Sequence, residues 1–599
     1  MITRIALGVI IAGVCLSTVR CNDSEWAYEC IKGYCQKVRL TEDNRDNAVS
    51  LGACRIFCSK YASLWPKPTG RVEVKRSLLQ VNYNSIDVLT HKGDSPIRSI
   101  INGAAKRFKH NIELLKPKKS TLKAGGRSLI VMLEIEDSSS VKFLYNQDES
   151  YSLNVTQTSD GRINAQIKSR NLFGGRHAME TLNQLIFYDD LRDELQMPDD
   201  VYIEDAPIYP HRGILLDTSR NYVSTDVIKQ TIEGMAASKL NVFHWHITDS
   251  HSFPYVSKSM PQLSKLGAYS REKIYTPEDV AEIIEFGKER GVMILPEFDA
   301  PAHVGEGWQD TGLLACFNKK PWQSYCVEPP CGQLDPTKPG VYDALEKIYK
   351  DMVEQFDPTV FHMGGDEVNE NCWKSEDNIV SWMTERNMTI DDPGFMKLWD
   401  HFQSQALDRF TKQRGHKLPI IMWTSKLTSK DYLTKYLKND TYIIQIWTLG
   451  NDPQIKELLK NGYRTILSNY DALYFDCGFA GWVTDGNNWC SPYIGWQKVY
   501  ENSPAKIAGN KYKNLMMGAE ATLWTEQADD TVIDSRLWPR AAAMAERLWS
   551  EPESTWKDAE ERMEIHRERL VRLNIKSDAI QPQWCQQHQG SCPLDGVLN

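Results

Sequence analysis

The feature that most constrains the fold is a repeating pattern from Arg212 onward. Short apolar runs recur there, and each is followed by polar residues and then by a helical segment. The runs are residues 213–217, 242–247, 292–296, 360–363, 419–423, 442–447, 465–468 and 515–518. Uninterrupted apolar runs suit parallel strands that are buried on both faces. Eight successive β-α units therefore predict a closed (β/α)8 TIM barrel.

The region before the barrel has a different pattern. Residues 129–135 and 151–155 are strand-like. Residues 174–186 place apolar side chains at three- and four-residue steps, which is typical of a helix. The sequence thus predicts an α/β protein in which a smaller α/β domain, residues 69–205, precedes a TIM-barrel catalytic domain, residues 206–599.

The first residues are typical of a secretory signal peptide. Arg4 supplies a positive charge, and residues 5–19 form an apolar run with small residues toward its end. This run is short for a membrane span, although a retained anchor is the alternative. We expect residues 1–21 to be a signal peptide and the protein to be secreted and extracellular, with no membrane partner.

Cysteine usage agrees with an oxidising compartment. The chain has 14 cysteines, of which Cys15 and Cys21 fall in or beside the signal. The others form local groups: Cys30, Cys35, Cys54 and Cys58 in a disulfide-rich segment, residues 22–68; Cys316, Cys326, Cys331 and Cys372; Cys477 and Cys490; and Cys585 and Cys592 in the C-terminal tail. Their even number predicts disulfides, and the nested first group favours Cys30 with Cys58 and Cys35 with Cys54. A zinc site is the competing interpretation.

The net charge and the surface motifs limit the kinds of molecule that the protein is expected to bind. The net charge of −9 argues against nucleic acid or an anionic membrane as a partner. Asn-X-Ser/Thr sequons, which are candidate glycosylation sites, occur at Asn22, Asn154, Asn387 and Asn439. The 18 tryptophans are unusual, and although most are expected in the core, an indole face also suits a sugar ring.

Carboxylates and tryptophans dominate the positions that follow the predicted strands. These positions are Arg220, Asp249, His303, Asp366, Glu367, Trp423, Trp447, Asp476 and Glu526. Catalytic groups of a TIM barrel lie at the C-terminal ends of its strands. Carboxylates bind hydroxyl groups and perform acid/base chemistry, whereas indoles stack on sugar rings. The pattern therefore predicts a sugar-binding pocket.

The sharpest motif is His-Met-Gly-Gly-Asp-Glu at residues 362–367. Its glycines permit a tight turn, and Asp366 and Glu367 can both reach one pocket if the strand ends there. Two close carboxylates resist being ionised together, so one pKa rises and one group can act as a general acid near neutral pH.

The side-by-side carboxylates also bear on the mechanism. An ordinary retaining glycosidase places its two carboxyls about 5 Å apart on opposite sides of the bond. Adjacent residues fit that arrangement poorly. They fit better a reaction in which the 2-acetamido oxygen of the sugar is the nucleophile, Glu367 is the acid and Asp366 holds the acetamido N–H.

Five segments, in chain order, resemble the family 20 glycoside hydrolases, the β-N-acetylhexosaminidases, which use substrate-assisted chemistry. They are residues 212–220, 241–249, 297–303, 362–367 and 524–526. The preceding α/β domain also resembles the N-terminal domain of the family. The resemblance implies retaining, exo-acting release of N-acetylglucosamine from the non-reducing end through an oxazolinium intermediate, and it implies no cofactor.

The resemblance also implies roles where the motifs match. Asp249 and His303 would orient Glu367, Arg220 would grip the 3- and 4-hydroxyls, and Glu526 would cap the 4-hydroxyl. Trp423, Trp447 and Trp524 would form an aromatic box around the acetamido methyl. Tyr474 would donate its hydroxyl to the acetamido oxygen, and Asp476 would be a further ligand for a sugar hydroxyl.

Two loops resemble the insect chitin-degrading members of the family, and they lie at residues 321–328 and 481–489. The resemblance implies that Val327, Glu328 and Trp489 meet a second sugar. Trp322 and Trp482 would extend the stacking surface, with ordinary loop packing as the alternative. A chitooligosaccharide substrate, a role in chitin degradation and a homodimer are implied in the same way.

Three other interpretations stay open. A lysosomal-type hexosaminidase would trim glycoconjugates with the same chemistry. A carbohydrate-binding homologue would keep the pocket without turnover. A metal-dependent hydrolase would use His244 and His246, which share one face of a strand, with His303 and His362 as further ligands.

Overall fold

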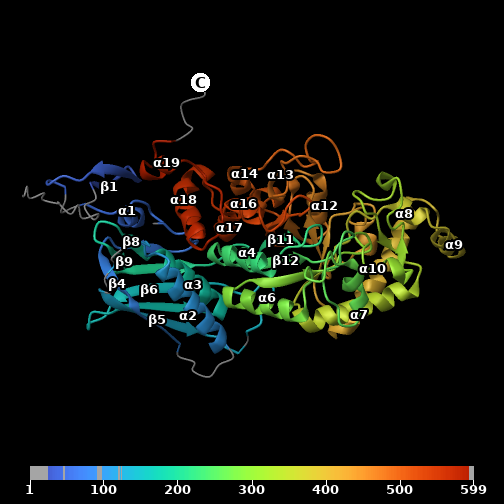
Figure 1. The fold of residues 1–599 in the computed structure, drawn as a ribbon, viewed down its shortest axis with the longest axis horizontal. Helices are drawn as coiled ribbons and strands as arrows, with labels where there is room; N and C mark the ends of the chain where they lie inside the picture. The colour runs from blue at the N-terminus through green and yellow to red at the C-terminus, as the bar shows by residue number, and fades with distance from the viewer. Residues whose placement is uncertain are drawn as a thin grey trace, which may run out of the picture.

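The computed structural model of the chain describes residues 25–592, except 45–47, 62, 91–96, 119–121, 123–124 and 140. A sheet near the N-terminus and a barrel make up most of the molecule (Figure 1). The expected signal peptide and Asn22 lie outside the described residues. Among the described residues, no helix combines the length and apolar character that a membrane span requires.

All eight predicted barrel strands form, and they close into a parallel barrel in chain order. They are β11 (His211–Asp217), β12 (Val242–His246), β13 (Met293–Glu297), β16 (Phe361–His362), β17 (Ile420–Trp423), β18 (Tyr442–Ile446), β19 (Arg464–Leu467) and β20 (Met516–Leu523). Every residue of β11, β12 and β20 is buried, which explains why these strands lack polar alternation. The predicted (β/α)8 fold is confirmed.

The longer helices pack around the barrel between its strands. They are α4 (Thr225–Ala237), α6 (Pro277–Arg290), α7 (Pro339–Phe356), α10 (Asp392–Arg414), α12 (Pro453–Lys460), α17 (Arg540–Ser550) and α18 (Trp556–Arg572). Local sequence sets their ends. For α6, Thr276 and Asp279 form a capping box at the start, and Gly291 ends the helix in the left-handed conformation.

The region before the barrel is an eight-stranded sheet of order β3-β10-β6-β7-β5-β4-β9-β8. Its strands are β3 (Val72–Val74), β4 (Leu78–Thr90), β5 (Arg127–Ile135), β6 (Tyr151–Gln157), β7 (Ile163–Ser169), β8 (Phe187–Asp189), β9 (Glu194–Pro198) and β10 (Val201–Asp205). Helices α2 (Arg98–Glu113) and α3 (Leu172–Gln184) cover it (Figure 1). The predicted strands at 129–135 and 151–155 and the helix at 174–186 correspond to β5, β6 and α3.

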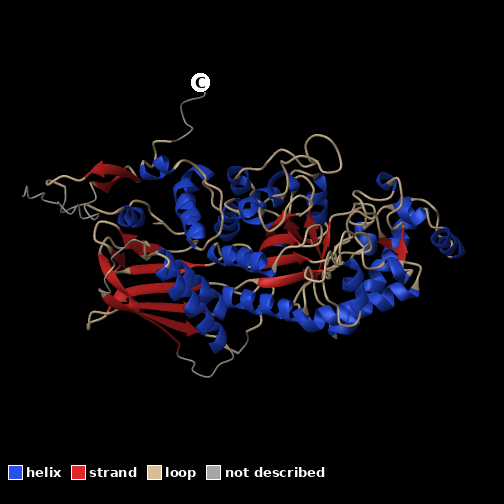
Figure 2. Ribbon diagram, viewed as in Figure 1, coloured by secondary structure: helices blue, strands red, loops and turns tan. Residues whose placement is uncertain are grey.

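Buried polar contacts join this sheet to the barrel. Glu149 accepts a hydrogen bond from Asn241 Nδ2 at 2.8 Å and pairs with Arg212. Asp205 pairs with Lys239 at 3.2 Å and accepts from Trp549 Nε1 at 2.8 Å. These contacts lie at the start of the barrel strands, so the loops that follow the strands gather at the opposite end (Figure 2).

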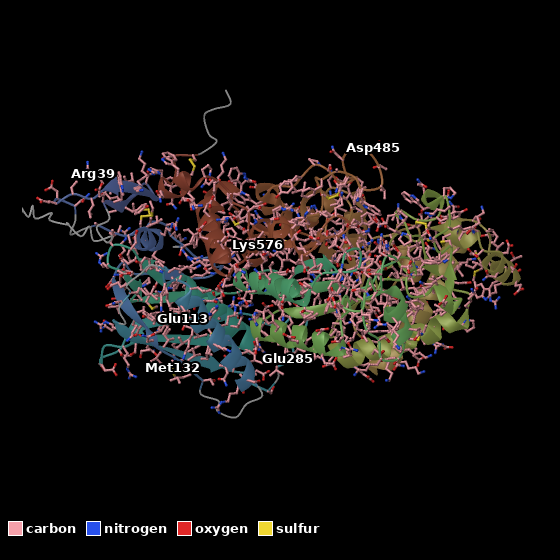
Figure 3. The ribbon with its side chains drawn as sticks, viewed as in Figure 1. Arg39, Glu113, Met132, Glu285, Asp485 and Lys576 are labelled. Atoms are coloured by element: carbon pink, nitrogen blue, oxygen red, sulfur yellow. A yellow bond between two sulfur atoms is a disulfide. The ribbon has the colours of Figure 1, made fainter. Side chains whose placement is uncertain are left out.

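Disulfides close the N-terminal segment, three barrel loops and the tail. Both nested pairs expected in the first group form, and they tie α1 (Leu51–Phe57) to β1 (Trp26–Ile31) and β2 (Tyr34–Arg39). The other bonds are Cys316–Cys372, Cys326–Cys331, Cys477–Cys490 and Cys585–Cys592. Sulfur atoms in disulfides appear yellow in Figure 3, where Asp485 marks the loop between Cys477 and Cys490. Since all twelve of these cysteines are in disulfides, none offers zinc a thiolate.

The described sequons differ in accessibility. Asn387 and Asn439 are exposed, whereas Asn154 lies half-buried within β6. The first two therefore present the more accessible amides.

Candidate active site

The site is built where β16 ends. Gly364 and Gly365 have φ of 59° and 83°, in the left-handed region that favours glycine. A Cβ on Gly364 would lie 1.8 Å from Asp299 Oδ1, so no larger residue fits there. Asp299 Oδ1 also accepts a hydrogen bond from Gly365 N at 2.8 Å. This turn brings both Asp366 and Glu367 to the same cavity.

A cavity of about 510 Å³ opens at this end of the barrel. It is lined by all the predicted site residues except Asp249 and Trp423. The lining members are Asp366, Glu367, His303, Arg220, Trp447, Tyr474, Asp476, Trp489, Trp524, Glu526, Val327, Glu328, Trp322 and Trp482. Residues at or after the ends of seven barrel strands and residues of two outer loops therefore converge on one space.

A chain of three side chains leads to Glu367. Asp249 lies beneath the cavity, with an oxygen 3.3 Å from His303 Nδ1. On the other side of the ring, His303 Nε2 lies 3.3 Å from Glu367 Oε2 and 3.9 Å from Asp366 Oδ2. Burial lowers the pKa of His303, but Asp249, Asp299 and Asp366 outweigh it and hold that pKa well above its usual range. The imidazole therefore carries a proton between these carboxylates.

The raised carboxyl pKa that was expected of the general acid belongs instead to Asp366, the residue expected to hold the acetamido N–H. Burial is the largest cause, and the nearby Glu367 adds to it, whereas His303 opposes it; the pKa of Asp366 is raised to about 6. Burial and the charge of Asp366 also hold the pKa of Asp299 well above its usual range. Asp299 and Asp366 thus oppose each other's ionisation.

The closed end of the cavity is rich in charge. Arg220 lies 3.0 Å from Asp249 and 3.0 Å from Glu328. Burial and the charge of Glu328 hold the pKa of Glu526 well above its usual range, although Arg220 opposes this. Burial raises the pKa of Asp476 to about 7. Glu328 was expected to contact the second sugar. It pairs with Arg220, the residue expected to bind the first sugar.

Aromatic rings form one wall. Trp447 and Tyr474 meet Trp489 with ring centroids 6.3 and 5.9 Å apart, and Tyr474 lies 6.5 Å from Trp524. Trp423 differs from the expected aromatic box, because it is 1% exposed and lies beneath Trp524. Its Nε1–H donates to Glu297 at 2.8 Å, and this bond holds the ring in the barrel interior.

Glu297 is the centre of a buried polar network below the cavity. Its carboxylate lies 3.1 Å from His244, 2.5 Å from His246 and 2.9 Å from His362. His246 continues upward to Asp249 at 2.9 Å. The network therefore connects the barrel core with the groups that position Arg220 and His303.

The same network bears on the metal alternative. His244, Glu297 and His362 are close enough to share an ion, but all three are buried beneath the cavity. Burial lowers the pKa of His244, yet Glu520 and Glu297 outweigh it and raise that pKa to about 9. An ion bound there would have to displace this proton, and it would lie beneath the cavity. Two further groups that could share an ion, His246–Glu297–Asp299 and Asp249–Asp299–His303, include residues that line the cavity.

Several lining residues were not predicted. His246 and Asp299 lie inside two of the motifs that resemble the family, and His246 was considered only as a metal ligand. Thr484, Asn488, Gln527 and Arg536 also line the cavity. Arg536 comes from the short α16 (Ile533–Leu537), and nothing in its local sequence marks it.

Two disulfide-closed loops form the outer part of the cavity. The Cys326–Cys331 bond closes the loop that carries Val327 and Glu328. The Cys477–Cys490 bond closes the loop that carries Trp482 and Trp489. Trp489 is 65% exposed and Trp482 is 42% exposed, so these rings present their faces to solvent.

Comparison with known proteins gives consistent matches over both parts of the chain. Residues 209–552 match the glycosyl hydrolase family 20 catalytic domain, and residues 64–185 match a domain described as beta-acetyl hexosaminidase like. The chain is 53% identical over 591 residues to a chitooligosaccharidolytic beta-N-acetylglucosaminidase of Ostrinia furnacalis, covering 98% of this chain and 99% of that protein. A protein of the same description from Bombyx mori is 52% identical, with 97% and 98% covered.

A solved structure supports the same relationship. The chitobiase of Flavobacterium johnsoniae superposes with a TM-score of 0.67 at 26% sequence identity, covering 86% of this chain and 73% of that one. The similarity thus extends beyond the barrel to most of the chain.

Proposed function

The chain belongs to glycosyl hydrolase family 20, and on that basis we propose that it releases terminal N-acetylglucosamine from the non-reducing end of chitooligosaccharides. It is a β-N-acetylhexosaminidase of the retaining, substrate-assisted kind, and its activity is consistent with chitin degradation. The observation that carries the proposal is the pair Asp366 and Glu367 at the mouth of the barrel, with His303 within 3.9 Å of both.

In the first step, Glu367 donates its proton to the glycosidic oxygen as the bond to the anomeric carbon breaks. The acetamido oxygen of the same sugar attacks that carbon, which forms the oxazolinium ion. Asp366 accepts a hydrogen bond from the acetamido N–H and balances the positive charge that develops. Tyr474 donates to the acetamido oxygen, while Trp447 and Trp524 enclose the methyl group with Trp423 beneath them.

In the second step, Glu367 removes a proton from water as the water attacks the anomeric carbon. The oxazolinium ring opens, and the sugar leaves with its original configuration. Asp249 and His303 act through Glu367 as positioning residues, since they lie behind it. The opposed second carboxyl of an ordinary retaining glycosidase is replaced by the substrate amide.

Substrate selection follows from the two ends of the cavity. At the closed end, Arg220, Asp476 and Glu526 bind the hydroxyls of the terminal sugar, which leaves no room for a further sugar and makes cleavage exo-acting. At the open end, Val327 and Trp489 meet the next sugar, and Glu328 contacts it from its ion pair with Arg220. Trp322 and Trp482 extend the stacking surface for longer chains.

The substrate-assisted step can be tested with two reagents. A thiazoline mimic of the oxazolinium ion should inhibit competitively and bind at least a hundredfold more tightly than N-acetylglucosamine, since a mimic of the reacting state is favoured. Chitobiose should be hydrolysed and cellobiose, which has no amide, should not. Equal cleavage of both would reject the mechanism, and binding of chitobiose without turnover would favour the carbohydrate-binding alternative.

The remaining properties are proposals that rest on sequence. Secretion is supported by the leader pattern in residues 1–21, and glycosylation by the exposed Asn387 and Asn439. A homodimer is supported by the family resemblance alone. Sedimentation of the secreted protein would test the dimer, and comparison of chitotriose with a branched N-glycan would separate chitin degradation from lysosomal-type trimming.

A further inference from the structure

A second cavity lies far from the barrel mouth, where the N-terminal segment, the sheet helices and the last long helix meet. Its volume is about 410 Å³. Its walls come from α1, the C-terminal ends of α2 and α3, the start of β8, and α18 (Figure 1). It shares no lining residue with the candidate active site. The proposed reaction gives it no role.

Three arginines face this cavity, Arg55 from α1 and Arg569 and Arg572 from α18. Arg55 Nε and one terminal nitrogen of Arg569 are buried and have no hydrogen-bond partner among the described residues. The other terminal nitrogen of Arg569 donates to Ser63 Oγ at 2.8 Å. Arg572 is exposed, at the edge of the cavity. Two guanidiniums thus present unused donors to an enclosed space.

Acidic groups of the protein, including Glu568, Glu564 and Glu180, offset this cationic charge only in part. Burial, then the charge of Arg572, lowers the pKa of Arg55 to about 10 and that of Arg569 to about 9. Such shifts mean that the surroundings disfavour the cation. Native proteins seldom bury charges without partners, so a cluster that is only partly compensated requires an explanation.

The acids around the cavity are either engaged by other arginines or have a raised pKa. Glu180 lies 2.9 Å from Arg107 and 3.5 Å from Arg176. Asp190 also lines the cavity, and partial burial raises the pKa of its carboxyl. Outside the wall, Glu568 lies 2.8 Å from Arg567. Glu561 and Glu564 also interact with Arg55, and burial raises the pKa of each to about 7. The described residues therefore leave the cavity with an excess of positive charge.

The rest of the lining is mixed. Its apolar side chains include Leu51, Ile56, Leu115, Ile186, Phe187 and Ile565, and its polar ones include Lys116, Asn183 and Gln184. Asn111 Oδ1 is a further buried polar atom with no partner among the described residues. A space of this size that combines an apolar wall with convergent polar groups is typical of small-molecule sites.

We propose that this cavity binds an organic anion, a carboxylate carried on an apolar body, with its head on Arg55, Arg569 and Arg572 and its body against the apolar wall. Guanidiniums pair with carboxylates through charge-assisted hydrogen bonds. The bound anion would contact α1, α3 and α18 together. It therefore stabilises the junction of the disulfide-rich segment, the sheet and the barrel.

The test uses decanoate, with decanol as a probe of the same chain length and no charge. Calorimetry on the secreted full-length protein should give one decanoate site per chain and binding at least tenfold weaker for decanol. Decanoate should raise Tm, since a ligand that binds only the folded state stabilises it. Turnover of a single-sugar reporter should not change, because the cavity is separate from the active site.

Variants locate the site. Arg55→Met should weaken decanoate binding about tenfold or more, the size expected for a charged hydrogen bond, and should leave the Tm of the free protein unchanged or higher, because an unpaired buried cation is removed. Arg572→Met, at the exposed edge, gives a second measurement if Arg55→Met folds poorly. Arg271→Met, an exposed arginine near α6, is the matched control.

Two results would overturn the assignment. One is equal affinity for decanoate and decanol, which would indicate an apolar cavity without anion recognition. The other is decanoate affinity that survives in both arginine variants. Neither result depends on the proposed hydrolase activity, so the two proposals can fail separately.

Discussion

The inner and outer parts of the active-site cavity are built in opposite ways. The inner part, around Asp366, Arg220 and Tyr474, is 4–9% exposed. The outer part, around Val327, Trp482 and Trp489, is 42–65% exposed. One part is enclosed by the protein, whereas the other is open to water even though it belongs to the same cavity.

The supports differ as well. Inner side chains follow barrel strands and are bonded from below, as Asp249 is by His246 and Trp423 by Glu297. Outer side chains lie on loops that are closed by disulfides between cysteines 5 and 13 residues apart. This difference indicates that bond breaking needs groups fixed within fractions of an ångström. Recognition of a long, repetitive substrate needs mainly a large contact surface. Inner substitutions should therefore change kcat, and outer ones the KM of long substrates.

The sharpest test of the inner part is Glu367→Gln. The amide keeps the shape of the side chain but has no proton to give, so kcat for chitobiose should fall by about 10²–10⁴. The dissociation constant measured by calorimetry should change little. A reporter with a good leaving group should lose less, since it needs less protonation. Normal turnover of chitobiose would show that another group is the acid.

Asp366→Asn should give the next largest loss, of about 10²–10³ in kcat, because the oxazolinium ion loses its counter-charge. The effect should depend on pH. Since the pKa of Asp366 is raised to about 6, this carboxyl is neutral below that pH and ionised above it. In the wild type, kcat/KM should fall as pH drops below about 6, and that acidic limb should vanish in the variant. An unchanged limb would assign it to another group.

Glu297→Gln tests whether the inner geometry depends on the core network. The amide lacks the negative charge that lies within 3.1 Å of three histidines, and it has one acceptor oxygen in place of two, so Trp423 and the His246–Asp249 arm should shift. Such displacement should lower kcat by a factor on the order of 10–100, while circular dichroism checks that the protein is folded. A double-mutant cycle with Trp423→Phe should show non-additive losses, because both changes remove one hydrogen bond. Additive losses would mean that the two residues act separately.

The contrast also explains what sequence could predict. Strand positions and the Asp366–Glu367 turn are local, because buried apolar runs and paired glycines mark them directly. The Arg220–Glu328 pair spans 108 residues, and the Glu297–Trp423 bond spans 126. Both depend on how distant strands align, which no local pattern encodes. For the same reason sequence gave no sign of the three-arginine cavity, whose walls come from segments of the chain that are far apart.

Trp489→Ala tests the outer part and should have the smallest effect. Its ring is 65% exposed and meets Trp447 and Tyr470 at centroid distances of 6.3 and 5.1 Å, so it can stack on a second sugar without supporting the barrel. Loss of one aromatic stacking partner, about 0.5–1.5 kcal/mol, should raise the KM for chitotriose a few-fold and leave kcat and the single-sugar reporter unchanged. Trp584→Ala, which removes an exposed tryptophan from α19 (Gln583–Gln587), is the matched control. If Trp489→Ala instead lowers kcat for the single-sugar reporter, Trp489 also positions the first sugar. The proposed division between an inner part that performs the reaction and an outer part that only binds substrate is then wrong.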